Sequence, residues 1–188
     1  MKKSTIITLA IVVLLALFCV GKYNGIVSKE ENVDNKWAQV DNQLKRRADL
    51  IPNLVNTVKG YATHEKEAID SVTQARAQLA GAKTPEDAAE ANGELSSALS
   101  RLLVVAENYP NLKADKNFQN LMDSLEGTEN RIAVARKDYN DGVTDFNQTI
   151  RKFPGNIIAG IAGAEKKKYF EVTEKEKEAP KVDFGGSN

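Results

Sequence analysis

The residues that could perform acid–base or metal chemistry in this chain are few, and their spacing matches no catalytic motif. His64 is the only histidine, and residues 64–68 lack the second histidine that a zinc protease helix carries four residues later. A di-iron bundle needs two Glu-x-x-His pairs, and the chain has none. A Ser/His/Asp triad would depend on His64 alone, in an expected interhelical turn. We therefore predict no enzyme, no metal and no cofactor, with a structural or surface role for His64.

Glycine and lysine clusters near the C-terminus also lack the context of a ligand-binding motif. Gly155, Gly160 and Gly163 do not form a phosphate loop, because no strand is expected before them and no Gly-Lys-Ser/Thr follows. The first 24 residues hold three lysines and no acid, so the remainder carries three more acidic than basic residues. Phosphate binding needs a basic patch, so a mildly acidic domain with interspersed charges argues against nucleic acid.

The remaining chemical candidates are four charged residues that lie on apolar helical stripes: Glu30, Arg47, Glu129 and Arg136. Antiparallel pairing of the two stripes that sets Ile26 opposite Phe153 places Arg47 between the levels of Glu129 and Arg136. An Arg47–Glu129 ion pair inside the helical core is then within reach. One interpretation is a polar functional site. The other, which we favour, is a register-fixing pair or side chains that extend to the core edge.

Hydrophobic periodicity predicts that long helices position these charges. Steps of four and three recur from Ile26 to Tyr61 and again from Phe118 to Phe153, and period-two strand patterns are absent. Pro52 lies inside the first stripe, where we expect a kink. Two shorter helices, one ending at Gly81 and one starting at residues 84–87, separate the stripes. The fold class is all-α: an N-terminal transmembrane helix, then an antiparallel four-helix bundle with long first and fourth helices.

Residues 4–21 are almost purely apolar and admit three interpretations. A cleaved signal peptide needs small residues before the cleavage site, and a lipoprotein signal needs one just before Cys19, where Phe18 stands. An uncleaved anchor is favoured, because eighteen residues span roughly 27 Å of helix, about one hydrocarbon core. The anchor would use these residues, the last two at the interface: Ile6, Leu9, Val12, Leu15, Phe18, Val20, Lys22 and Tyr23.

The charges that flank this segment bear on topology. Lys2, Lys3 and the amino terminus outweigh Lys22, which favours an N-terminus in the cytoplasm and an exported domain. Lys29 and Lys36 weaken that bias over a wider window. We expect a single-pass protein of the bacterial inner membrane, with the bulk of the chain extracytoplasmic or, alternatively, cytoplasmic.

We divide the chain into an anchor (1–24), a helical bundle (25–153) and a C-terminal segment (154–188) whose end, after Thr173, is charged and mobile. The middle helices are too short to cover the whole long pair, so the C-terminal segment or a second copy must cover the rest. Part of this segment also fits an interfacial contact with anionic lipid. Its candidate residues are Ile157, Ile158, Ile161, Lys166, Lys167 and Lys168. The alternative, which we favour, is a strap over the exposed base of the long helix pair.

Several stretches resemble the LemA family of bacterial membrane-associated proteins. The most specific is Arg-Arg-x-Asp-Leu-Ile-Pro-Asn-Leu-Val at residues 46–55. Others lie at residues 23–27, 37–40, 58–65, 109–114, 117–118, 129–132, 139–140, 169–171 and 180–184. The resemblance covers nearly the whole chain and implies one membrane-spanning helix, a helical bundle and no catalytic residues. It also implies a large domain in the cytoplasm, which opposes the flank charges, so the topology stays open.

Two classes of function fit these observations. The favoured one is a membrane-tethered, non-enzymatic scaffold or adaptor of the cell envelope, whose partners would be the lipid bilayer, another envelope protein or a second copy of the chain. The alternative is a ligand- or metal-handling accessory domain that uses the charged stripe residues.

Overall fold

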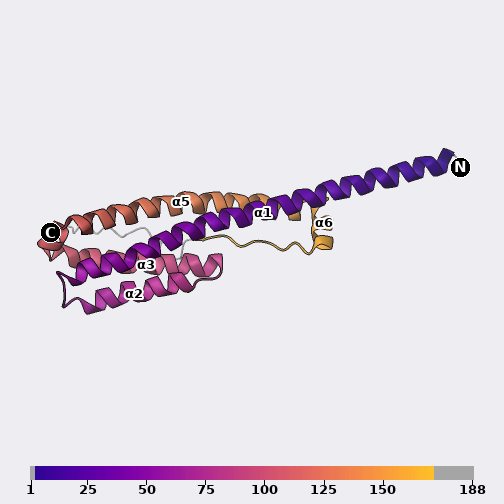
Figure 1. Cartoon of the computed structure of the whole chain (residues 1–188). Helices are drawn as coiled ribbons and strands as arrows, with labels where there is room; N and C mark the ends of the chain where they lie inside the picture. Colours follow the sequence, from indigo (N-terminus) through magenta and orange to yellow (C-terminus); the bar gives the residue numbers. More distant parts are fainter. Residues whose placement is uncertain (1–2, 172–188) are drawn as a thin grey trace, which may run out of the picture. The chain divides into compact units, whose positions relative to one another are not determined.

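The computed structural model of the chain describes residues 3–171, and every regular element in that range is a helix (Figure 1). The helices are α1 (Lys3–Lys59), α2 (Lys66–Gly81), α3 (Pro85–Glu107), α4 (Pro110–Lys113), α5 (Lys116–Arg151) and α6 (Gly155–Ala162). The all-α prediction is therefore confirmed over this range. The expected mobile tail after Thr173 and the motif at residues 180–184 lie outside the described residues.

Contacts group the chain into two units, and the long helices α1 and α5 contribute to both. Among the described residues, the first unit comprises residues 3–41 and Ala133–Tyr169. The second comprises Asn42–Ile132 and, of the described residues after the first unit, Phe170 and Glu171. The expected division into residues 1–24, 25–153 and 154–188 stays a prediction.

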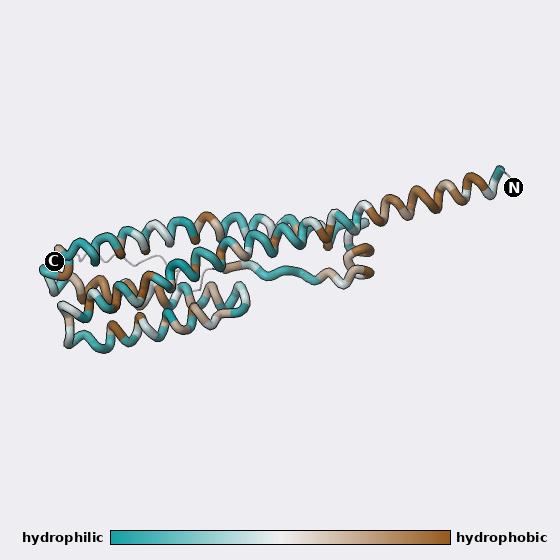
Figure 2. Tube along the Cα trace, viewed as in Figure 1, coloured by the Kyte–Doolittle hydropathy of each residue, from teal (hydrophilic) through white to brown (hydrophobic). Residues whose placement is uncertain are grey.

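The N-terminal part of α1 is apolar and exposed. It is the one helix among the described residues that is long and apolar enough to cross a membrane, and Figure 2 shows it as the brown end of the helix. The predicted anchor side chains are all exposed: Ile6, Leu9, Val12, Leu15, Phe18, Val20, Lys22 and Tyr23. No helix end separates this segment from the stripe that begins at Ile26, which is only 2% exposed.

Polar side chains start two of the later helices. The hydroxyl of Thr84 accepts a hydrogen bond from the backbone N–H of Asp87 (3.1 Å), and Pro85 occupies the first turn of α3, as the sequence predicts. The Asp115 carboxylate accepts hydrogen bonds from the backbone N–H groups of Asn117 and Phe118, each 2.9 Å long. Both side chains satisfy N–H groups that have no partner inside the helix.

The core of the second unit forms from the stripes of four helical segments. Leu54 and Val58 of α1, Val72 of α2 and Leu95 of α3 are fully buried, and Leu125 of α5 is 4% exposed. α2 and α3 pack against each other. Burying each such side chain contributes about 1.5–3 kcal/mol, so this core supplies much of the stability of the unit.

The first unit holds α1 against α5 in antiparallel orientation. Lys29 pairs with Asp145, and the Lys36 ammonium donates a hydrogen bond to the backbone carbonyl of Asp138 (3.1 Å). The rings of Trp37 and Tyr139 lie 5.5 Å apart. The buried side chains of this unit are Ile26, Val33, Val40, Tyr139, Val143, Phe146, Ile150 and Ile158.

The sequence patterns missed two short helices. Proline usually ends a helix that precedes it, but Pro110 and Pro154 each stand at the start of a new helical turn, α4 and α6. Proline suits these positions because its missing N–H would lack a helical partner there anyway.

Candidate functional site

Arg47 forms the centre of a buried polar network in the second unit. The helical phase of α1 places it between Leu44 and Ile51 on the buried stripe, and it is 5% exposed. Its guanidinium donates hydrogen bonds to Asn92 Oδ1 (2.5 Å) and Ser96 Oγ (3.1 Å) of α3. A buried charge is costly unless it is paired and hydrogen-bonded, and these contacts from α3 reduce that cost.

The same guanidinium pairs with Glu129 of α5, with Nη1 and Oε2 2.6 Å apart. The two partners differ in environment, because the Arg47 side chain is 6% exposed and that of Glu129 is 46% exposed. The carboxylate therefore keeps part of its hydration, and most of the desolvation cost falls on the arginine. Arg47 thus connects α1, α3 and α5 through one side chain.

The other two predicted core charges do not join this network. Glu30 is half-buried in the first unit, where it pairs with Lys167 at 3.0 Å. Arg136 is half-buried in the same unit. The structure thus brings Arg47 and Glu129 together and places Glu30 with a different cation.

Asn92 and Ser96 are the network members that sequence reasoning missed. The stripe of α3 runs through Ala88, Leu95 and Leu99, and Asn92 occupies the intervening position, four residues after Ala88 and three before Leu95. The sequence signal for Asn92 was therefore a polar residue at a position where the helical repeat expects a buried apolar one. Nothing in the sequence of α3 alone identifies its partner, because the partner lies 45 residues away.

A second polar contact explains how α1 passes through Pro52. Proline has no N–H, so the carbonyl of Ala48, one turn earlier, loses its helical donor. The Arg76 Nε of α2 donates a hydrogen bond to that carbonyl (3.2 Å), and α1 continues to Lys59. The helix therefore contains the proline, and a neighbouring helix replaces the missing hydrogen bond.

Two tyrosines make hydrogen bonds with carboxylates where the helices of the second unit turn. Tyr61 donates to Asp115 (2.9 Å), and Tyr109 donates to Glu65 (3.1 Å). Hydrogen bonds from the Phe118 backbone and the Tyr61 hydroxyl lower the pKa of Asp115 below its ordinary value. The same bond to Asp115 raises the pKa of Tyr61. The two bonds connect the turn after α1 with the turns that precede α2, α4 and α5.

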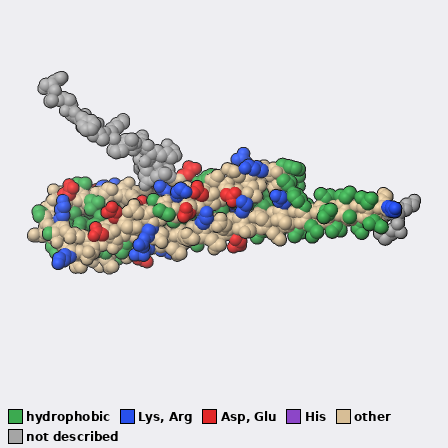
Figure 3. All heavy atoms as spheres, turned by 90° about the horizontal axis from the view of Figure 1, so that it is seen from above, with side chains coloured by type: hydrophobic (Ala, Val, Ile, Leu, Met, Phe, Trp, Pro, Cys, Tyr) green, Lys and Arg blue, Asp and Glu red, His purple; other side chains and the backbone are tan. Residues whose placement is uncertain are grey.

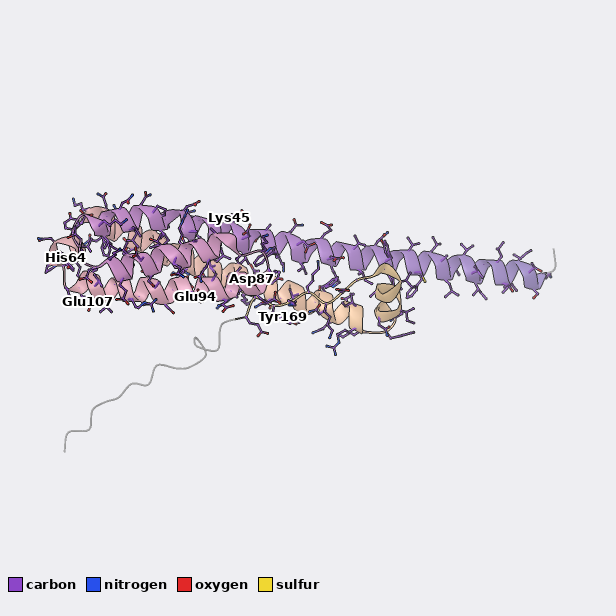
Figure 4. The ribbon with its side chains drawn as sticks, turned by 90° about the horizontal axis from the view of Figure 1, so that it is seen from below. Lys45, His64, Asp87, Glu94, Glu107 and Tyr169 are labelled. Carbon is purple, nitrogen blue, oxygen red and sulfur yellow. The ribbon has the colours of Figure 1, made fainter. Side chains whose placement is uncertain are left out.

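The distribution of titratable groups does not assemble a catalytic constellation in the described part of the chain. His64 is exposed, and Figure 4 places it at the turn after α1, away from Asp87 and Glu94 of α3. Asp87, Glu90 and Glu94 line an open groove beside the end of α2. Within residues 3–171, no three His, Cys, Asp or Glu side chains converge as a metal site.

The chain after α6 runs back along the first unit and is held by α5. Asn147 receives a hydrogen bond from the Lys167 backbone N–H (3.0 Å) and donates one to the Lys167 carbonyl (2.8 Å). Tyr139 donates to the Lys168 carbonyl (2.8 Å). The Lys167 ammonium lies 3.0 Å from Glu30 and 3.1 Å from Asp34 of α1. We call residues 164–169 the strap.

The predicted membrane-contact residues divide between α6 and the strap. Ile157 and Ile161 of α6 are 55% and 84% exposed, whereas Ile158 is 8% exposed and packs inward. In the strap, Lys166 and Lys168 are exposed and Lys167 is half-buried between acidic partners.

These observations define a class of protein: within residues 3–171 every regular element is a helix, and the longest helix starts as an exposed apolar segment and ends in a packed core. The chain belongs to the LemA family, whose model matches residues 36–184. It is 28% identical to magnetosome protein MamQ 2 of Paramagnetospirillum magneticum over 176 residues, 80% of this chain and 65% of that protein. It is 26% identical to protein LemA of Metamycoplasma hominis over 141 residues, 74% of this chain and 64% of that protein. The chain therefore spans just under two thirds of these relatives.

Proposed function

We propose that this protein is a membrane-tethered, non-enzymatic helical scaffold or adaptor of the bacterial cell envelope. The observation that carries the proposal is the continuity of α1, whose exposed apolar start runs without a break into the buried stripe at Ile26. A helix that is apolar all round has no stable place in water and fits a lipid bilayer.

The architecture that we propose for residues 42–132 is an antiparallel four-helix bundle. The Arg47 contacts to α3 and α5, the Arg76 contact between α2 and α1, and the packing of α2 on α3 support it. Such a bundle presents several solvent-facing helix surfaces to partners.

The location that we propose is the inner membrane, crossed once by α1. We place the bulk of the chain outside the cytoplasm, which the flanking charges favour, with the cytoplasmic side implied by the family resemblance as the alternative. The name of MamQ assigns that relative to magnetosomes, and we carry over from it no more than a role at a bacterial membrane.

The non-enzymatic part of the proposal is supported by the way polar groups are used. Arg47 stays charged at all physiological pH values, and its neighbours are an amide, a hydroxyl and a carboxylate that hydrogen-bond to it. This arrangement stabilises a charge inside the core and connects helices, which suits a rigid scaffold.

Photocrosslinking in living cells tests the adaptor function. A crosslinking amino acid would replace Val104, which is 62% exposed on α3, or Val134, which is equally exposed on α5. We expect a discrete adduct with one envelope protein, or a dimer-sized adduct, from one position, and its loss when a charge is introduced beside that position. The proposal would be overturned by the absence of adducts together with a metal- or ligand-dependent thermal shift that Glu129→Ala abolishes.

A further inference from the structure

The short helix α6 has one seated face and one exposed face. Gly155, Ile158 and Ala159 are buried, and a Cβ on Gly155 would lie 2.2 Å from the backbone oxygen of Thr149, so only glycine permits this approach. Gly163 ends the helix in the left-handed conformation (φ 68°). Its seat on α5 thus fixes which side chains of α6 face outward.

The outward face is strongly apolar. Phe153, just before α6, is 81% exposed, and Ile157 and Ile161 are 55% and 84% exposed. Ile157 and Ile161 are four residues apart and lie along one side of α6, and Phe153 is exposed in the turn that precedes the helix. An exposed apolar cluster of this kind indicates a surface that contacts either another protein or the lipid of a membrane.

The position of α6 along α1 indicates that this surface contacts membrane lipid. The contacts of Lys29 with Asp145 and of Lys36 with Asp138 establish an antiparallel register between α1 and α5. The same register, continued toward the N-terminus, sets Arg151 level with Tyr23. α6 therefore begins at the level where α1 becomes apolar and exposed, as Figure 2 shows for the brown α6 beside the brown segment of α1.

The direction of α6 fits the plane of a membrane. Figures 1 and 4 both show α6 running crosswise to α1 within the first unit. If α1 crosses a bilayer, a helix crosswise to it at the boundary lies along the surface. Figure 3 shows apolar side chains gathered at this end, next to the apolar segment.

The charges around α6 suit the headgroup layer. Lys22 of α1, Arg151 and Lys152 at the end of α5, and Lys166 after α6 are all exposed. Cations that flank an apolar face favour the surface of anionic phospholipid.

We propose that α6 is an interfacial helix that inserts Phe153, Ile157 and Ile161 into the same bilayer that α1 crosses. The proposal rests on the membrane-tethered function and adds a second, in-plane contact that fixes the rotation of the first unit about α1. It differs from the sequence-based candidate set, because Ile158 packs inward and Lys167 is engaged by Glu30 and Asp34. The contact is therefore an apolar helix face, not the lysine run.

Spin labels on the full-length protein in vesicles of phosphatidylcholine and phosphatidylglycerol test this directly. In a Cys19→Ser background, single cysteines replace Ile161, Leu15 and Val134, of which Val134 is 62% exposed on α5. The ratio of oxygen to nickel-chelate accessibility reports lipid against water. We expect the ratios at Ile161 and Leu15 to exceed the ratio at Val134 several-fold.

The controls separate this proposal from the tether itself. A lipid-like ratio at Leu15 with a water-like ratio at Ile161 would overturn the interfacial helix and leave the tether intact. Dipolar broadening between Ile161 labels on separate chains, lost on dilution with unlabelled protein, would assign the face to a second copy and also overturn the proposal. Water-like ratios at both positions would overturn tether and interfacial helix together.

Discussion

The two units hold the same pair of helices together by different means. In the second unit α1 and α5 meet around a buried guanidinium that also binds α3, in a core of leucine and valine side chains. In the first unit they meet through buried apolar side chains, lysine–carboxylate contacts nearer the surface and the strap, with no buried charge of this kind among the described residues. A buried cation has few alternative partners, whereas exposed ion pairs exchange with water at little cost. We therefore expect substitutions at the buried cation of the second unit to cost more stability than substitutions at the ion pairs of the first.

The largest effect should come from Arg47→Ala, because it leaves the 5%-exposed Asn92 without its partner and empties part of the core. We expect a loss of about 3–5 kcal/mol in the free energy of unfolding of the second unit. Denaturant unfolding in detergent micelles, followed by far-UV circular dichroism, measures it. Arg46→Ala, at the exposed neighbour, should change stability by less than about 0.5 kcal/mol. Equal losses in the two variants would contradict the special role of Arg47.

Two glutamates provide a direct comparison between the units. Glu129→Ala removes the carboxylate partner of buried Arg47, and we expect a loss of about 1–3 kcal/mol, less than for a fully buried pair because Glu129 is half exposed. Glu30→Ala removes a partner of Lys167 and should cost about 0–1 kcal/mol. Denaturant unfolding followed by far-UV circular dichroism measures the stability of both variants, and Trp37 fluorescence reports the first unit separately. An unchanged stability in Glu129→Ala would mean that the Arg47–Glu129 pair contributes nothing.

Arg76→Met should cost about 1–2 kcal/mol, because it leaves the Ala48 carbonyl without a donor. In a Pro52→Ala background the N–H of residue 52 can supply the helical hydrogen bond, so the same change at Arg76 should cost less. A double-mutant cycle of unfolding free energies measures this coupling. Additive losses would show that Arg76 does not compensate for the proline.

Asn147→Ala should release the strap without unfolding the unit. It removes both hydrogen bonds to the Lys167 backbone, each worth about 0.5–1.5 kcal/mol. We expect faster hydrogen exchange at residues 164–169 and little change in the core of α5. Uniformly faster exchange across the first unit would indicate instead that the strap is integral to its fold.

The smallest expected effect is on the loss of stability at acidic pH. The folded-state pKa of Asp115 is lowered, so its stabilisation is present above the unfolded value of about 3.9 and is lost as pH falls through the lower folded value. Unfolding midpoints measured between about pH 5 and pH 2 should fall less steeply in Asp115→Asn, which no longer titrates but still caps the helix. Identical slopes would remove Asp115 from the acid response.

Periodicity in the sequence predicts the stripes, the all-helical class, the start of α3 at Thr84 and the exposed apolar segment, because each depends on neighbours within a few turns. The Arg47–Glu129 contact follows from antiparallel register alone. Asn92 and Arg76 could not be assigned in the same way, since their partners depend on how separate helices rotate about their axes. α6 could not be predicted, because Pro154-Gly155 is typical of a helix end and the helical turn depends on packing against α5.

The central claim is that the N-terminal part of α1 lies in lipid in the mature protein, and the native cysteine tests it without any substitution. Cys19 is exposed on that segment in the structure. In intact membranes we expect Cys19 not to react with a membrane-impermeant maleimide. After solubilisation in detergent we expect it to react. We also expect the mass of the mature protein to show that residues 1–24 are still present. Reaction without detergent would contradict the claim, as would a mature chain that has lost residues 1–24.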